Sequence, residues 1–184
     1  MQALLALIVA LGLQIAVNYS NDYSDGIRGT DDVRVGPIRL TASGLASAKA
    51  VKRAAFISFG VACVAGLALA ATSSWWILIV GIISVLAAWG YTGGHAPYGY
   101  LGFGELSVFT FFGVVATVGT YYVQTLEFSG AAFAASVSMG SLSCALLAIN
   151  NIRDRAQDAQ VGKKTLAVRL GDKNARRFFI ALLT

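Results

Sequence analysis

Acidic and amide side chains cluster in two polar segments of this 184-residue sequence, and each segment follows a long apolar stretch. The first segment contains two amides and two carboxylates: Asn18, Asn21, Asp22 and Asp25. The second segment contains one amide and two carboxylates: Asn151, Asp154 and Asp158. These side chains follow the first amide of their segment by three, four or seven residues, and such positions share one face of an α-helix. The pattern predicts two helices that each present carboxylates and amides at one end.

Carboxylates clustered at the edge of an apolar layer repel one another and resist desolvation, so we expect them to have cationic partners. Mg²⁺ prefers oxygen ligands and usually combines one or two carboxylates with the phosphate oxygens of a substrate. Two carboxylate pairs that face each other could therefore hold metal ions that bridge a diphosphate. Three nearby cations are expected to balance the remaining phosphate charge: Arg28, Lys163 and Lys164.

Other interpretations of these segments are weaker. Asn and Asp also cap helices and form turns, so one such cluster alone would fit an ordinary loop, whereas two matched clusters favour the metal site. Residues 162–165 resemble the end of a phosphate-binding P-loop, but Gln157 stands where that motif has its first glycine. His95 is the single histidine, which excludes a histidine-based metal site or catalytic triad within this sequence.

The elements that must position these side chains are apolar. Charged residues make up 12% of the sequence, against about one quarter in soluble domains. Five stretches without charged residues are predicted to cross the membrane as helices: 1–17, 54–71, 75–92, 106–125 and 128–149. Residues 178–184 are predicted to open a sixth span. The sequence thus predicts an all-α, multi-spanning transmembrane helix bundle.

The basic residues predict the orientation of this bundle. All 14 lysine and arginine residues lie in two connecting segments, 22–53 and 150–177. The connections on the opposite side, 72–74 and 126–129, contain none. Because positive loops stay cytoplasmic, both acidic helix ends and segment 93–104 are predicted to face the cytoplasm. The net charge of +5 arises from these loops, so it does not predict a nucleic-acid partner.

This orientation places Met1 on the outer side, which predicts that another helix precedes the chain. Residues 1–184 are therefore predicted to form a single transmembrane domain that lacks the N-terminal helix and the C-terminal helices of a larger bundle.

Three segments in order resemble motifs of the UbiA superfamily of membrane prenyltransferases. Residues 18–39 resemble its first aspartate-rich motif, and residues 150–171 resemble its second. Residues 91–105 look like the central cytoplasmic loop of the branch that prenylates 1,4-dihydroxy-2-naphthoate. Gly29 stands where the wider superfamily usually has a further aspartate, and the next acids, Asp31 and Asp32, give the arrangement of the naphthoate branch.

The resemblance implies a UbiA-like bundle in a bacterial inner membrane, with the active site facing the cytoplasm. It implies Mg²⁺ held by four catalytic carboxylates: Asp22, Asp25, Asp154 and Asp158. Four cations are expected to contact the diphosphate: Arg28, Arg153, Lys163 and Lys164. Three amides are expected to support substrate or metal binding: Asn18, Asn21 and Asn151. Three tyrosines either stack near the acceptor and shield positive charge or anchor the protein at the membrane interface: Tyr91, Tyr98 and Tyr100.

The implied reaction transfers a polyprenyl group from a polyprenyl diphosphate, which enters from the lipid bilayer, to 1,4-dihydroxy-2-naphthoate. Loss of the acceptor's carboxylate would give demethylmenaquinone, on the pathway to menaquinone. Another aromatic acceptor, such as 4-hydroxybenzoate or homogentisate, remains the nearest alternative. A cation transporter is a more distant one, because the acids of transporters more often lie near the middle of the membrane.

Overall fold

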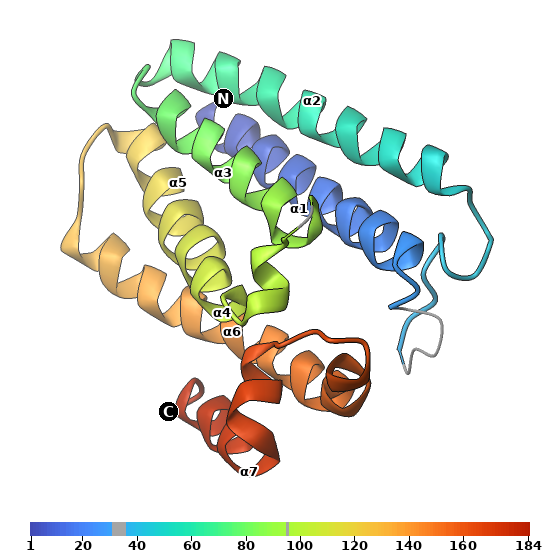
Figure 1. Ribbon diagram of the computed structural model, residues 1–184. Coiled ribbons are helices and arrows are strands. Elements are labelled where there is room, and N and C mark those ends of the chain that lie inside the picture. The colour runs from blue at the N-terminus through green and yellow to red at the C-terminus, as the bar shows by residue number, and fades with distance from the viewer. Residues whose placement is uncertain (31–35, 95) are drawn as a thin grey trace.

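The computed structural model describes residues 1–30, 36–94 and 96–184, and the regular secondary structure in these ranges is entirely helical (Figure 1). The elements follow one another along the chain as α1 (Gln2–Ile27), α2 (Ala48–Thr72), α3 (Ile77–Thr92), η1 (Tyr98–Leu101), α4 (Gly104–Val108), η2 (Phe109–Val115), α5 (Ala116–Thr125), α6 (Gly130–Gln160) and α7 (Leu166–Ala181). Asp31, Asp32 and His95 lie outside the described residues.

Four helical segments within the described ranges are long and apolar enough to cross a membrane: Gln2–Ile27, Ala48–Thr72, Gly104–Thr125 and Gly130–Gln160. The third of these joins α4, the π-helix η2 and α5 into one rod, and the shorter α3 is also apolar. Large apolar side chains such as Leu67 and Leu86 are exposed on the outside of the bundle, as a lipid environment allows. The predicted all-α, multi-spanning membrane fold is confirmed.

Small residues let the helices approach closely. At Gly12 on α1, an added Cβ would lie 3.0 Å from the Cβ of Ala62 on α2. At Gly113 on η2, an added Cβ would lie 2.5 Å from the Cα of Gly140 on α6. Contacts of this kind stabilise helix pairs in membranes, where burial of apolar surface gives no drive for helix association.

Helix ends that are distant in sequence meet at one end of the bundle, where the C-terminal turns of α1, α3 and α6 lie around η1 (Figure 1). The Arg28 guanidinium donates a hydrogen bond of 2.7 Å to the carbonyl oxygen of Thr92, the last residue of α3. The backbone N–H of Lys164 donates one of 2.8 Å to the carbonyl oxygen of Tyr100 in η1. Gly29 follows the end of α1 with a positive φ of 71°, a conformation that glycine adopts without strain.

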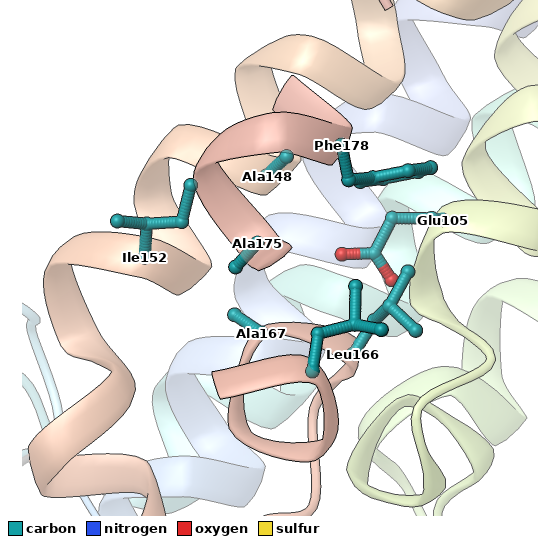
Figure 2. Close-up of a pocket in the computed structure, with 8 residues that line it drawn as sticks. Glu105, Ala148, Ile152, Leu166, Ala167, Ala175 and Phe178 are labelled. Carbon is teal, nitrogen blue, oxygen red and sulfur yellow. The ribbon is translucent and has the colours of Figure 1, made fainter. Parts of the chain in front are cut away.

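Helix α7 packs across the C-terminal part of α6. Ile152, Ala167 and Ala175 form a small buried cluster between them, and Figure 2 shows these side chains beside Phe178 and the carboxylate of Glu105. The opposite face of α7 is polar and includes an exposed ion pair of 2.9 Å between Arg176 and Asp172. Residues 178–184 are expected from the sequence to open a sixth span. In the structure, residues 178–181 form the last turn of α7, and the sixth span stays a prediction.

Candidate active site

An elongated cavity of about 960 Å³ lies between α1, α3, the η2–α5 segment and α6. Its lining changes from apolar to polar along α1, from Leu7 and Leu11 to Asn18, Asn21 and Asp25. This order follows from the sequence of α1, because residues three or four apart stay on the same side of a helix. The cavity thus has an apolar body and a polar end where the helix termini meet.

Carboxylates from two separate helices reach the polar end. Asp25 comes from α1, and Asp154 and Asp158 come from α6. The Lys163 ammonium forms an ion pair of 3.0 Å with Asp25, and the two side chains are only 14% and 6% exposed. Asp158 interacts electrostatically with Lys163, Asp154 and Asp25. The structure therefore brings together three of the four carboxylates that the sequence singled out.

Asp22, the fourth carboxylate, is placed differently from the expectation. It is 5% exposed and lies outside the lining of the cavity. Its Oδ2 accepts a hydrogen bond of 2.8 Å from the backbone N–H of Leu40, and its Oδ1 accepts one of 2.8 Å from that of Thr41. The carboxylate thus faces the backbone of the segment that precedes α2.

The four cations expected near the diphosphate also separate. Lys163 lines the cavity, whereas Arg28, Arg153 and Lys164 lie outside its lining. Arg28 donates hydrogen bonds to the carbonyl oxygens of Thr92, the last residue of α3, and of Gly94, just after it. Carbonyl groups at the end of a helix have no partner within the helix. Arg153 forms a two-pronged ion pair with Asp154, with N–O distances of 2.6 and 2.7 Å. The side chain of Lys164 is exposed, and its backbone N–H donates a hydrogen bond to the carbonyl oxygen of Tyr100.

The three tyrosines form one wall of the polar end. Tyr91, Tyr98 and Tyr100 all line the cavity, and the rings of Tyr91 and Tyr98 pack edge to face with centroids 5.6 Å apart. The Tyr100 hydroxyl donates to Oδ1 of Asp25, and the Lys163 ammonium lies 4.6 Å from the centre of the Tyr100 ring. Burial, and then the negative charge of Asp25, raise the pKa of Tyr100, so this phenol remains a donor at neutral pH.

Lys163 remains an ammonium in this setting. Burial alone lowers the pKa of Lys163, but the charge of Asp25, together with Tyr100 and Asp158, more than offsets it. The pKa of Lys163 therefore lies above its ordinary value. A positive charge is fixed at the polar end, between a carboxylate from α1 and one from α6.

The three predicted asparagine side chains border the cavity. Asn18, Asn21 and Asn151 all belong to its lining. The Asn151 amide nitrogen donates a hydrogen bond of 2.9 Å to Oε1 of Glu105, which leaves the amide oxygen available to a cation. Asn21 uses its oxygen to accept a hydrogen bond of 2.7 Å from the Thr92 hydroxyl, and that oxygen has a second lone pair.

Sequence analysis missed several residues of this site. Arg39, Thr92, Asn150 and Gln157 line the polar end although no role was predicted for them. Glu105 is 6% exposed and holds Asn151, and its position at the start of a charge-free span was a signal that could have singled it out. Arg39 lies in an irregular segment, where no periodicity indicates which way a side chain points.

The donor set suits a hard cation that arrives with its own oxygen ligands. Within residues 1–30, 36–94 and 96–184, no three His, Cys, Asp or Glu side chains are grouped so that they could hold a metal ion by themselves. Mg²⁺ does not require such a cage, because it commonly binds through one or two carboxylates plus phosphate oxygens and water. Asp25 on α1 and Asp154 and Asp158 on α6 border the cavity from two sides, and one or two of these carboxylates fit this mode of binding.

These features define a membrane-spanning helix bundle with an acidic site at the polar end of an apolar cavity. The profile of the UbiA prenyltransferase family matches residues 1–184, and the chain belongs to this family. No solved structure shows a significant match to the chain.

The curated relatives include octaprenyltransferases and a phytyltransferase from several bacteria. The chain is 54% identical to the 1,4-dihydroxy-2-naphthoate octaprenyltransferase of Mycobacterium tuberculosis, over 99% of the chain and 62% of that protein. It is 43% identical to the 1,4-dihydroxy-2-naphthoate octaprenyltransferase of Escherichia coli, over 98% of the chain and 61% of that protein. It is 29% identical to the 2-carboxy-1,4-naphthoquinone phytyltransferase of Synechocystis, over 91% of the chain and 54% of that protein. The chain thus spans about three fifths of the length of the first two relatives.

Proposed function

We propose that the protein transfers a polyprenyl group from a polyprenyl diphosphate to 1,4-dihydroxy-2-naphthoate, as part of menaquinone biosynthesis. The observation that carries the proposal is the cavity, which joins an apolar body to an end with three carboxylates, a half-buried lysine and several amides. A prenyl diphosphate has the same division between an apolar tail and a charged head. The names of the most similar relatives support the choice of the acceptor.

The polar end would bind the diphosphate. Asp25 on α1 and Asp154 and Asp158 on α6 would hold Mg²⁺, which neutralises the diphosphate and makes it a better leaving group when bound. Lys163 would donate hydrogen bonds from its ammonium to phosphate oxygens, because it already lies between these carboxylates. In the absence of substrate, its ion pair with Asp25 stabilises both buried charges.

The apolar body of the cavity would hold the start of the prenyl tail. Side chains such as Leu11, Val118 and Phe133 line it, and they offer no hydrogen bonds that would compete with the head group. The binding energy of this part of the substrate would fix the first allylic carbon next to the polar end, where the reaction takes place.

In the reaction, the bond between the allylic carbon and the diphosphate oxygen breaks, and its electron pair leaves with the oxygen. The ring carbon of the naphthalenediol that carries the carboxylate then bonds to the allylic carbon, and the electron pair of its bond to the carboxylate restores the aromatic ring as CO₂ leaves. The acceptor loses its carboxylate as CO₂, which gives demethylmenaquinol, the reduced form of demethylmenaquinone. The rings of Tyr91, Tyr98 and Tyr100 would face the developing positive charge and exclude water from it.

We further propose that the polar end faces the cytoplasm of a bacterial cell. All lysines and arginines of the sequence lie in residues 22–53 and 150–177, which contain the acidic ends of α1 and α6, and positively charged connections remain on the cytoplasmic side. The lipid bilayer would then supply the prenyl diphosphate, and the soluble, carboxylated acceptor would enter from the cytoplasm.

The proposal is tested with the purified full-length enzyme, Mg²⁺, a labelled prenyl diphosphate and an equimolar mixture of aromatic acceptors. Mass spectrometry is expected to find prenylated and decarboxylated naphthalenediol as the main product, and Asp154→Asn is expected to abolish it. If 4-hydroxybenzoate or homogentisate gives product and the naphthoate gives none, the proposed acceptor is wrong. Ion flux through reconstituted protein without any prenyl transfer would favour a transporter instead.

A further inference from the structure

Both carboxylate oxygens of Asp22 are held by backbone donors. Each of its oxygens accepts a hydrogen bond of 2.8 Å, one from Leu40 and one from Thr41. Hydrogen bonds from N–H groups to a carboxylate are charge-assisted and stronger than neutral ones. Two consecutive N–H groups that point at one carboxylate fix both the position and the orientation of the backbone that carries them.

A close steric contact reinforces this attachment. Gly26 lies one helical turn after Asp22, on the same side of α1. A Cβ added at Gly26 would lie 2.5 Å from Cγ2 and 2.6 Å from Cβ of Thr41. The segment therefore rests directly on the helix at Gly26 while Asp22 binds its backbone.

The attached segment places Arg39 beside the cavity. Arg39 directly precedes Leu40 and belongs to the lining of the cavity. The segment is also closed by its own backbone, because the N–H of Ser43 donates to the carbonyl oxygen of Arg39 at 3.0 Å and the N–H of Ala46 donates to that of Leu40 at 3.1 Å. Arg39 thus lies in a turn whose backbone is bound by Asp22.

We propose that Asp22 is a positioning residue that holds the Leu40–Thr41 backbone against α1, so that Arg39 contacts the phosphate oxygens of the substrate. The proposal rests on the proposed function in one respect, that the substrate carries a diphosphate. The guanidinium of Arg39 has five N–H donors in a planar fork that matches phosphate oxygens. Of these two acids on α1, Asp25 borders the cavity and Asp22 holds the segment that contains Arg39.

Amide hydrogen exchange in the full-length protein tests the attachment directly. Asp22→Asn leaves one acceptor for two N–H groups, so the amides of Leu40 and Thr41 are expected to exchange at least about tenfold faster. Asp25→Asn is the matched control, since Asp25 has the same side chain on the same helix but points into the cavity, and it is expected to leave both rates unchanged. Unchanged rates in Asp22→Asn would overturn the proposal, whether or not the enzyme transfers prenyl groups.

Binding of inorganic diphosphate, measured by calorimetry at varied Mg²⁺ concentration, tests the consequence for Arg39. Asp22→Asn and Arg39→Gln are each expected to weaken diphosphate binding about tenfold or more without changing the Mg²⁺ concentration at half-saturation. Asp25→Asn is expected to raise that Mg²⁺ concentration. The double variant Asp22→Asn/Arg39→Gln is expected to bind no more weakly than either single variant, because both remove the same contact.

Two outcomes of the binding experiment contradict the proposal. If Asp22→Asn raises the Mg²⁺ requirement as Asp25→Asn does, Asp22 is a metal ligand. If the losses in the double variant add up, Arg39 does not depend on Asp22.

A second variant covers the case in which Asp22→Asn does not fold. Gly26→Ala pushes Thr41 away from α1 without altering any charge, and it is expected to weaken diphosphate binding in the same way as Arg39→Gln. Gly60→Ala is its control, because a Cβ there meets no atom within 4 Å. Equal diphosphate binding by Gly26→Ala and Gly60→Ala would remove the link between the segment and the site.

Discussion

Replacing Lys163 by methionine removes the half-buried positive charge at the polar end and keeps a flexible side chain that is one atom shorter. In the structure, its ammonium lies 3.0 Å from Asp25, and the two side chains are 14% and 6% exposed. A hydrogen bond to a charged group contributes about 1.5–3 kcal/mol, so the loss of one such bond to the diphosphate weakens binding by about ten- to a hundredfold. Loss of a partner from a fully buried pair costs more, but Asp25 keeps its hydrogen bond from Tyr100 and borders a cavity.

The assay is calorimetric binding of inorganic diphosphate with Mg²⁺, together with the KM for prenyl diphosphate, in the full-length enzyme. Lys164→Met is the matched control, because this neighbouring lysine is exposed and lies outside the lining of the cavity. The control is expected to bind diphosphate as the unmodified enzyme does. Mg²⁺ binding without diphosphate is expected to be no weaker in Lys163→Met, because Asp25 loses a competing cation. The reasoning is refuted if Lys164→Met shows the larger loss, or if Lys163→Met binds diphosphate normally.

Three further variants probe other parts of the structure. Tyr100→Phe removes the hydrogen bond to Asp25 and is expected to lower kcat/KM by about tenfold while thermal stability stays nearly constant. Glu105→Ala releases the amide of Asn151 and is expected to raise the Mg²⁺ concentration needed for half-maximal rate, whereas Glu105→Gln retains an acceptor and should do so less. Gly113→Ala is expected to lower the melting temperature in detergent because its Cβ would meet Gly140, whereas Gly119→Ala, in open space, is expected not to.

The membrane fold could be predicted from sequence because its signals are simple. Charge-free stretches long enough to cross the bilayer correspond to α1, α2, α3, the α4–α5 rod and α6. The glycines after the first polar segment mark the end of α1, which the structure places at Ile27. Helix α7 was harder to predict, because its many polar residues are typical of a cytoplasmic connection and Gly171 interrupts its helical geometry.

The spacing argument located the acidic helix ends but could not separate Asp22 from Asp25. Successive residues of an α-helix are about 100° apart, so two residues three positions apart differ by about 60° in direction. Asn18, Asn21 and Asp25 lie on the side that faces the cavity, and Asp22 lies at the edge of that face, within reach of Leu40. Helical spacing predicts a shared face, and what borders each edge of it depends on the tertiary packing.

Which of the predicted cations border the cavity also depends on tertiary contacts. Arg153 lies about 160° around α6 from Asn151 by the same geometry, so it starts on the other side of the helix and reaches only Asp154, without joining the lining of the cavity. Arg28 is captured by carbonyl oxygens at the end of α3, which is distant in sequence. Lys163 and Arg39 lie in irregular segments, where the direction of a side chain is determined by the fold and cannot be inferred from a repeat.

In the proposed site, α1 and α6 converge on one metal-bound diphosphate. A crystal structure of the full-length enzyme tests this convergence most directly. Crystals grown with Mn²⁺ in place of Mg²⁺ and a non-reactive thio analogue of the prenyl diphosphate would locate the metal by its anomalous scattering. We expect the metal and the diphosphate between Asp25 on one side and Asp154 and Asp158 on the other, with Lys163 on a phosphate oxygen. Metal bound at only one helix, or a diphosphate outside this cavity, would contradict the proposed site.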